Sequence, residues 1–137
     1  MPDVFALVTT EVLDAAALEL FVASDENGAL VTFRGIIRNH DHGSAVSSLE
    51  YSAHPEAQRF LHDACTTIAN ETGLRVAAAH RIGALGIGDV ALVATVAAAH
   101  RDEAFAASER LVDLIKQTVP IWKRQHLADG ATEWVGL

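Results

Sequence analysis

The chain has 137 residues, of which 50% are hydrophobic and 20% charged, with a mean hydropathy of +0.22 and a net charge of −8 at pH 7. This length fits one domain, expected over residues 1–137, and the apolar content excludes a disordered chain. The acidic balance argues against nucleic acid or an anionic membrane surface as a partner.

The first part of the chain alternates between predicted strands and one helix. Residues 4–8 form an apolar run typical of a strand, and residues 13–22 are rich in helix formers, with Thr10 or Asp14 as a candidate cap. β-Branched and aromatic residues predict strands over 29–37 and 46–53. Residues 38–44 between them contain no apolar side chain and are expected to form a loop.

The second part of the chain continues with two helices and further strands. Pro55 suits the first position of a helix that ends at Gly73. Strands are predicted over 75–82 and 90–97, with a glycine-rich connection over 83–88. The longest amphipathic pattern begins at Asp102 and stops at Pro120, and residues 122–135 resemble a hairpin. This order predicts an α+β fold with about three helices.

Several common functional motifs do not fit the sequence. His40 and His42 suggest zinc, but no partner ligands follow at zinc spacing, so a solvated loop is favoured. Cys65 lies on the apolar stripe of a predicted helix and is expected to be a core residue rather than a nucleophile. The glycines at 83, 86 and 88 lie between two strands, which excludes a dinucleotide-binding turn.

Cellular location follows from what the sequence lacks. Its single cysteine permits no internal disulfide bond, which fits a reducing compartment. No apolar run approaches the ~20 residues that cross a bilayer. The N-terminal residues show no export signal. We therefore expect a cytoplasmic protein.

Basic residues gather at the ends of predicted elements. Residues 1–33 hold six acidic residues and no Lys or Arg, and the only two lysines lie seven positions apart near the C-terminus. A lysine can lose its proton when buried, which an arginine cannot. Each cation alone could be a surface ion pair, as between Lys116 and Asp113. Together they indicate an anion-binding pocket. The candidates are Arg38, His100, Arg101, Lys116 and Lys123.

Six groups of residues resemble one known family in their order and spacing. They are VTFRGIIRNH at 31–40, LEY at 49–51 with PEA at 55–57, HRIGAL at 80–85 with GD at 88–89, HR at 100–101 with AF at 104–105, PIWKR at 120–124 and EWV at 133–135. The set is similar to the large, catalytic subunit of molybdopterin synthase over nearly the whole chain. The resemblance implies the α/β-hammerhead fold, with a mixed, mostly antiparallel sheet.

The resemblance also implies a sulfurtransferase reaction in molybdenum cofactor biosynthesis. Two sulfurs pass to cyclic pyranopterin monophosphate and form the dithiolene of molybdopterin. They arrive as a thiocarboxylate on the Gly-Gly C-terminus of a ubiquitin-like small subunit, whose tail enters a pocket of the large subunit. The implied assembly is a large-subunit homodimer flanked by two small subunits, a heterotetramer, and no cofactor or metal is implied.

Family site positions fall on the five candidate residues. Lys116 and Lys123 are the implied catalytic pair, with proton transfer assigned to Lys116 and positioning of substrate or intermediate to Lys123. All five are implied to bind substrate, and His100 and Arg101 suit its phosphate. The competing hypothesis is a non-catalytic dimeric binding module for an anionic pterin or phosphate ligand. A small metallohydrolase built on the histidine loop is disfavoured.

Overall fold

The computed structural model describes residues 3–41, 44–127, 130 and 132–136. Within these ranges the chain forms helices and strands in mixed order. They are β1 (Val4–Thr9), α1 (Ala15–Val22), β2 (Ala29–Ile36), β3 (His40–Asp41), β4 (Ser44–Ala53), α2 (Ala57–Thr72), β5 (Arg75–Arg81), β6 (Gly83–Gly86), β7 (Val90–Ala98), α3 (Arg101–Thr118), β8 (Ile121–Leu127) and β9 (Thr132–Gly136).

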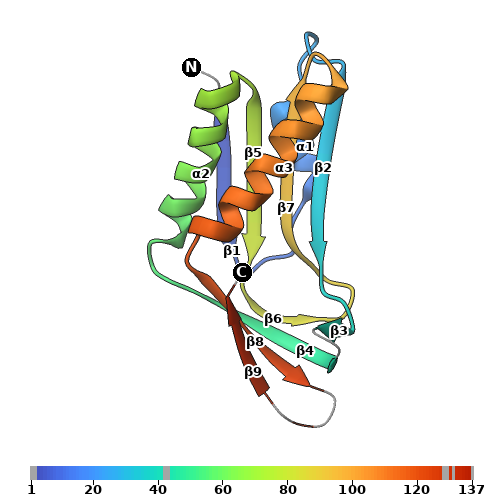
Figure 1. The fold of residues 1–137 in the computed structure, drawn as a ribbon, viewed down its shortest axis with the longest axis vertical. Helices are drawn as coiled ribbons and strands as arrows, with labels where there is room; N and C mark the ends of the chain where they lie inside the picture. Colours follow the sequence, from blue (N-terminus) through green and yellow to red (C-terminus); the bar gives the residue numbers. More distant parts are fainter. Residues whose placement is uncertain (1–2, 42–43, 128–129, 131, 137) are drawn as a thin grey trace.

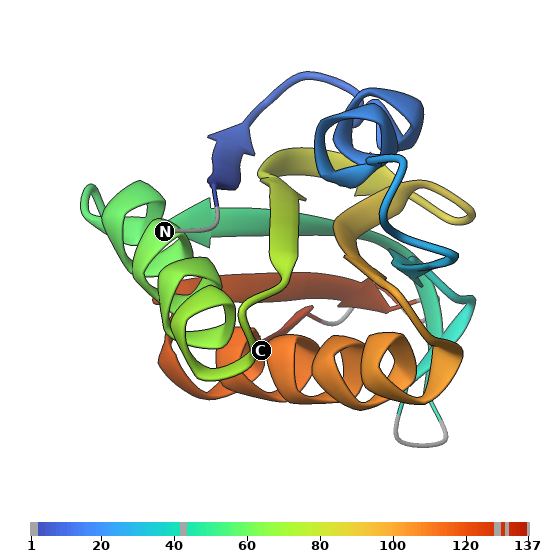
Figure 2. The same cartoon turned by 90° about the horizontal axis from the view of Figure 1, so that it is seen from above.

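The first sheet has the strand order β1-β5-β7-β2, with β1 parallel to β5 and the other pairs antiparallel. Helix α1 covers one face and helices α2 and α3 cover the other (Figures 1 and 2). Both central strands are therefore buried on two faces. Ala77 and Ala79 pack beneath Leu18 of α1, whereas Val76 and Ala78 face the core under α2 and α3. This two-sided burial explains why residues 76–79 read as a continuous apolar run.

The second sheet is antiparallel and has the order β3-β4-β8-β9, with β6 also paired to β4. In Figure 1 it extends from the lower end of the first sheet, where β2 and α3 end. Its buried face carries Leu49 and Tyr51 from β4 and Ile121 and Gln125 from β8. The two sheets thus meet near the C-terminal end of α3, and this junction positions the candidate site.

The α+β fold with three helices among the described residues is confirmed, with strand pairs divided between two sheets. Asp14 caps α1, because its Oδ1 accepts a hydrogen bond from the Ala17 N–H at 3.1 Å. Helix α2 begins at Ala57, two residues later than the sequence predicted. The reason is a turn before it, in which the Ala57 N–H donates to the His54 carbonyl at 2.9 Å.

Two segments predicted as connections contain strands, so those predictions were wrong. His40–Asp41 forms β3 against the start of β4, while residues 42 and 43 of the predicted loop lie outside the described part. Gly83–Gly86 forms β6 and pairs with β4 from Ser48 to Tyr51. Neither segment has the alternating pattern of a strand. Each becomes one because β4 offers it a hydrogen-bonding edge.

Candidate active site

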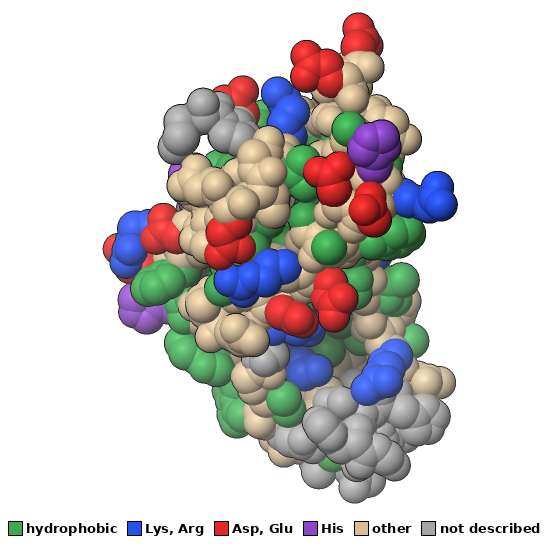
Figure 3. Space-filling view, turned by 45° about the horizontal axis from the view of Figure 1, so that its top comes forward, with side chains coloured by type: hydrophobic (Ala, Val, Ile, Leu, Met, Phe, Trp, Pro, Cys, Tyr) green, Lys and Arg blue, Asp and Glu red, His purple; other side chains and the backbone are tan. Residues whose placement is uncertain are grey.

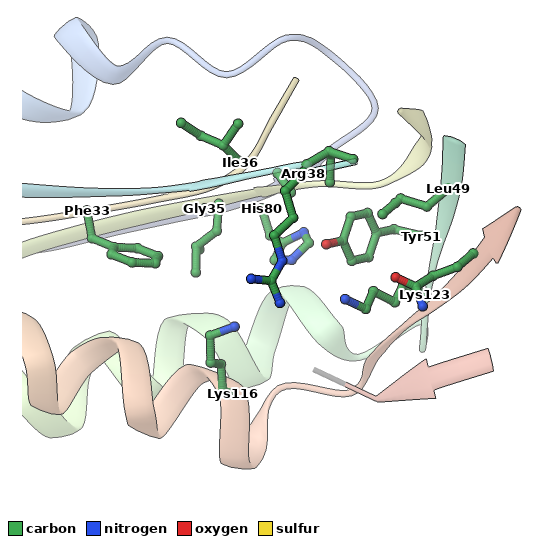
Figure 4. A pocket seen from close by; sticks show the side chains of 13 residues that line it. Phe33, Gly35, Ile36, Arg38, Leu49, Tyr51, His80, Lys116 and Lys123 are labelled. Atoms are coloured by element: carbon green, nitrogen blue, oxygen red, sulfur yellow. The ribbon is translucent and has the colours of Figure 1, made fainter. Parts of the chain in front are cut away.

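A cavity of about 220 Å³ opens where the two sheets meet beside the C-terminal end of α3 (Figure 4). Its walls come from both sheets, α3 and the segment that follows β2. The lining residues are Phe33, Gly35, Ile36, Ile37, Arg38, Leu49, Tyr51, His80, Ala91, Leu92, Lys116, Lys123 and Gln125. Three of the five residues predicted from the sequence, Arg38, Lys116 and Lys123, therefore lie in one cavity.

Lys116 reaches the cavity from the last turn of α3, where the helix dipole favours a cation. The adjacent Ile115 is fully buried, and its carbonyl accepts the N–H of Val119 at 3.0 Å, which fixes the helix end. The Lys116 side chain is exposed and points across the cavity toward Arg38 (Figure 4). Among the described residues no carboxylate forms an ion pair with it, so the alternative surface pair with Asp113 is absent.

Arg38 lies at the rim of the cavity, two residues beyond the end of β2. The pairing of β2 with β7 shifts between Gly35 and Ile36, so the strand changes course there. The next residue, Ile37, is then held on both sides of its backbone. Its N–H donates to the Asp89 carbonyl at 2.9 Å, and its carbonyl accepts the Gly88 N–H at 2.8 Å. These bonds fix the direction from which Arg38 enters the site.

Lys123 comes from β8 and lies opposite Tyr51 of β4 in the strand register. Alternate residues of a strand share a face, so Lys123 lies between the inward-facing Ile121 and Gln125. Lys123 is half-buried, whereas Gln125 is only 2% exposed. The cavity is therefore cationic at its rim and neutral at its floor.

His80, at the end of β5, forms part of that neutral floor. Its Nδ1 lies 2.8 Å from the Arg81 carbonyl oxygen, which can only accept, so Nδ1 carries the proton and Nε2 keeps its lone pair. Its ring meets Tyr51 edge to face, with centroids 4.8 Å apart. Burial lowers the pKa of His80 to about 4; the bond to Arg81 opposes this shift, and the charge of Lys116 adds to it. His80 is therefore neutral at physiological pH.

The other two predicted site residues lie elsewhere in the chain. His100 is the N-cap of α3 and Arg101 its first residue, and with Asp102 they line a separate, open hollow. At ~1.5 Å per residue, the helix from Arg101 to Lys116 spans about 22 Å. One chain therefore does not bring His100 and Arg101 to the cavity that holds the lysines.

The sequence prediction missed three polar residues of the cavity: Tyr51, His80 and Gln125. A signal for two of them was present. His80 ends the apolar run of β5, and Gln125 stands two residues after Lys123, at the inward position of the same strand. A polar side chain at a buried strand position requires a partner, and that requirement singles out such residues.

Other sequence expectations concern residues away from the cavity. Cys65 is fully buried in the main core, which confirms it as a core residue, and burial raises the pKa of its thiol to about 12. Among the described residues no group of His, Cys, Asp and Glu could hold a metal ion, and His42 lies outside them. None of the described helices is long and apolar enough to cross a membrane. Figure 3 shows acidic and basic side chains interspersed on one face.

Comparison with known proteins shows which proteins this chain resembles in sequence and in structure. A family model described as MoaE protein matches residues 8–118. A molybdopterin synthase catalytic subunit from Nostoc sp. is 36% identical over 98% of this chain and 83% of its own length. Molybdopterin synthase catalytic subunit 1 from Mycobacterium tuberculosis is 39% identical over 96% of this chain and 90% of its own length. The crystal structure of molybdopterin synthase from Staphylococcus aureus matches with a TM-score of 0.87 at 32% identity, over 95% of this chain and 96% of that one.

Proposed function

The chain belongs to the MoaE protein family, and we propose from this that it is the catalytic subunit of a molybdopterin synthase. In this role it transfers sulfur from a thiocarboxylated small subunit to cyclic pyranopterin monophosphate. The observation that carries the proposal is the single cavity that gathers Arg38, Lys116 and Lys123 above a neutral, buried floor. Family membership agrees with the resemblance found in the sequence.

The charge of the cavity suits two anionic reactants. Both the cyclic phosphate of the precursor and the thiocarboxylate are negative, so they repel each other as they approach. Cations preorganised between them offset this repulsion, and they do so more strongly in a partly enclosed site than in water. Arg38 serves as a fixed positive charge at the rim, because an arginine stays protonated.

We assign proton transfer to Lys116 and positioning of substrate or intermediate to Lys123. Lys116 has no carboxylate partner among the described residues, so its ammonium is available to a ligand. A positioned acid or base of this kind contributes roughly 10²–10⁴-fold to a rate. Lys123 is half-buried beside Tyr51, and the strand pairing restricts its movement.

We further propose that the working assembly contains two copies of this chain. His100 and Arg101 are expected to bind the substrate phosphate, yet they lie about 22 Å along α3 from Lys116. A second copy related by two-fold symmetry would bring its own His100 and Arg101 to the cavity of the first. The small subunits would then attach to this dimer, with each tail entering one cavity.

A reconstituted conversion assay tests the proposed function. The purified chain alone should be inactive, because the described residues provide no sulfur source and Cys65 is buried. Addition of a ubiquitin-like small subunit with a thiocarboxylated Gly-Gly terminus should convert the precursor to molybdopterin. Retention of the precursor without conversion would instead indicate a binding module, and activity without any sulfur-donor protein would contradict the proposed sulfur route.

A further inference from the structure

Gln125, one of the residues that line the cavity, carries a buried hydrogen-bond donor without a partner. Among the buried side-chain nitrogen and oxygen atoms that the structure describes, only Nε2 of Gln125 has no hydrogen-bond partner. Gln125 is 2% exposed and lines the cavity. A buried donor without a partner destabilises the folded state, so its presence in a binding cavity points to a ligand that accepts from it.

The position of Gln125 restricts which ligand group can reach it. It lies two residues beyond Lys123 on the same face of β8, and its register partner on β4 is the apolar Leu49. Lys123 is half-buried and Arg38 and Lys116 are exposed, so the cations stand nearer to solvent than the amide does. A ligand that meets Gln125 must therefore pass three cations, which favours an anionic group at the end of a narrow chain.

We propose that Gln125 Nε2 donates a hydrogen bond to the carbonyl oxygen of the thiocarboxylate that ends the small subunit's tail. This inference rests on the proposed function and adds a residue that binds the sulfur donor. A Gly-Gly terminus has no side chains and so fits a cavity of about 220 Å³. The neutral amide holds the oxygen without offering a proton at physiological pH, which leaves the charged sulfur to the lysines and the incoming substrate.

The substitution Gln125→Met separates binding from folding. Methionine has a similar length and no donor, so it removes the unpartnered amide from the floor. The isolated variant should therefore melt at a higher temperature than the wild type. Its dissociation constant for the small subunit in the carboxylate form, measured by calorimetry, should rise about tenfold or more, the scale of one hydrogen bond to a charged group. Gln117→Met, the same change at an exposed position of α3, should alter neither value.

A second partner locates the effect at the tail. With a small subunit that lacks its two terminal glycines, the wild type and Gln125→Met should bind equally, because the group that accepts the bond is gone. Equal weakening with both partners, or unchanged affinity for the complete tail, would overturn the inference. A change confined to the affinity for cyclic pyranopterin monophosphate would overturn it too, by assigning the amide to the other reactant.

The variant Gln125→Glu tests the direction of the bond. A carboxylate keeps the shape but cannot donate when ionised, and it places a negative charge beside the incoming anion. It should weaken binding of the complete tail at least as much as methionine does; wild-type affinity would contradict the inference. If the wild-type chain converts the precursor and the Gln125 variants bind the small subunit as tightly as the wild type, the inference fails and the proposed function stands. If the wild-type chain never binds the small subunit, the inference and the proposed function both fail.

Discussion

The two ends of α3 carry three of the five site residues predicted from the sequence, and the surroundings of these two ends differ. At the C-terminal end, Lys116 faces a cavity that also contains Arg38 and Lys123 above a neutral floor. At the N-terminal end, His100 and Arg101 are exposed and share an open hollow with the acidic Asp102 alone. One end is enclosed by its own chain, and the other is not.

This difference shows which residues of the proposed site a single chain brings together in one cavity. The C-terminal end of α3 meets the junction of two sheets, so strands supply walls, a floor and fixed directions for the side chains. Among the described residues, the N-terminal end of α3 has no second sheet beside it, and salt in the solvent screens the charges exposed there. Electrostatic attraction between these residues and an anion becomes stronger only where another protein surface excludes the solvent. We therefore infer that a second copy of the chain covers them.

The largest expected effect is at Lys116, at the enclosed end. Lys116→Ala should lower turnover by roughly 10²–10⁴-fold, the contribution of a positioned acid or base. It should change the free energy of unfolding by less than about 0.5 kcal/mol, because the side chain is exposed. Turnover in the reconstituted assay and urea unfolding provide the two measurements.

Lys116→Arg sharpens this prediction. The arginine keeps the positive charge but does not release a proton at neutral pH, so turnover should stay nearly as low as in the alanine variant. Asp113→Ala, one turn earlier on the same helix, serves as the control and should remain active. Near-normal turnover of Lys116→Arg would show that the residue contributes charge alone.

The next effect tests whether the open end of α3 works in a second copy. Lys116→Ala and Arg101→Ala should each be nearly inactive as pure proteins. Mixed and reassociated in equal amounts, they should recover about a quarter of the wild-type turnover, since half the dimers are mixed and each has one intact site. No recovery on mixing, with mixed dimers verified by mass spectrometry, would contradict the assignment of Arg101 to the site of the partner copy.

A third prediction concerns acid stability at the enclosed end. Since burial lowers the pKa of His80 to about 4 from 6.5, the unfolded chain binds a proton between these pH values and the folded chain does not. Stability should therefore be unaffected by His80 above pH ~6.5 and fall by up to about 3 kcal/mol as the pH drops to ~4. Urea unfolding at a series of pH values measures the decline.

Two variants separate His80 from other titrating groups. His80→Gln should remove this part of the decline and give a flatter dependence of stability on pH. Gln117→Met, which changes an exposed residue of α3 and removes no titratable group, should leave the dependence as in the wild type. The assignment fails if His80→Gln and the wild type lose the same stability between pH 7 and pH 4.

The smallest effect is expected at Cys65, which lies on α2 in the core and outside the lining of the cavity. Cys65→Ala should cost about 1 kcal/mol of unfolding free energy, the scale of one small buried group. Turnover should be retained. The native thiol should also resist a disulfide reagent at pH 8, because burial raises its pKa to about 12. Complete loss of activity in a folded variant would mean that the residue carries sulfur.

Local sequence patterns predicted the long elements of the fold well. The helical repeat of residues 101–118 and the apolar runs of β5 and β7 each depend on neighbours close in sequence. The short strands β3 and β6 were missed, because their pairing is decided by an edge of β4 that lies far away in the chain. In the same way, its position on β8 marks Gln125 as an inward-facing residue, but only the packing of β8 shows that it lines a cavity.

The amino-acid sequence by itself determined the α+β class, the helices and most strands, the core role of Cys65, the family and the basic residues proposed for the site. These properties follow from periodicity, composition and ordered motifs along the chain. Only the tertiary structure decided that Arg38, Lys116 and Lys123 share a cavity while His100 and Arg101 lie at the other end of α3. The physical reason is that proximity and burial depend on how sheets and helices pack, and a rigid helix of 18 residues keeps its two ends apart.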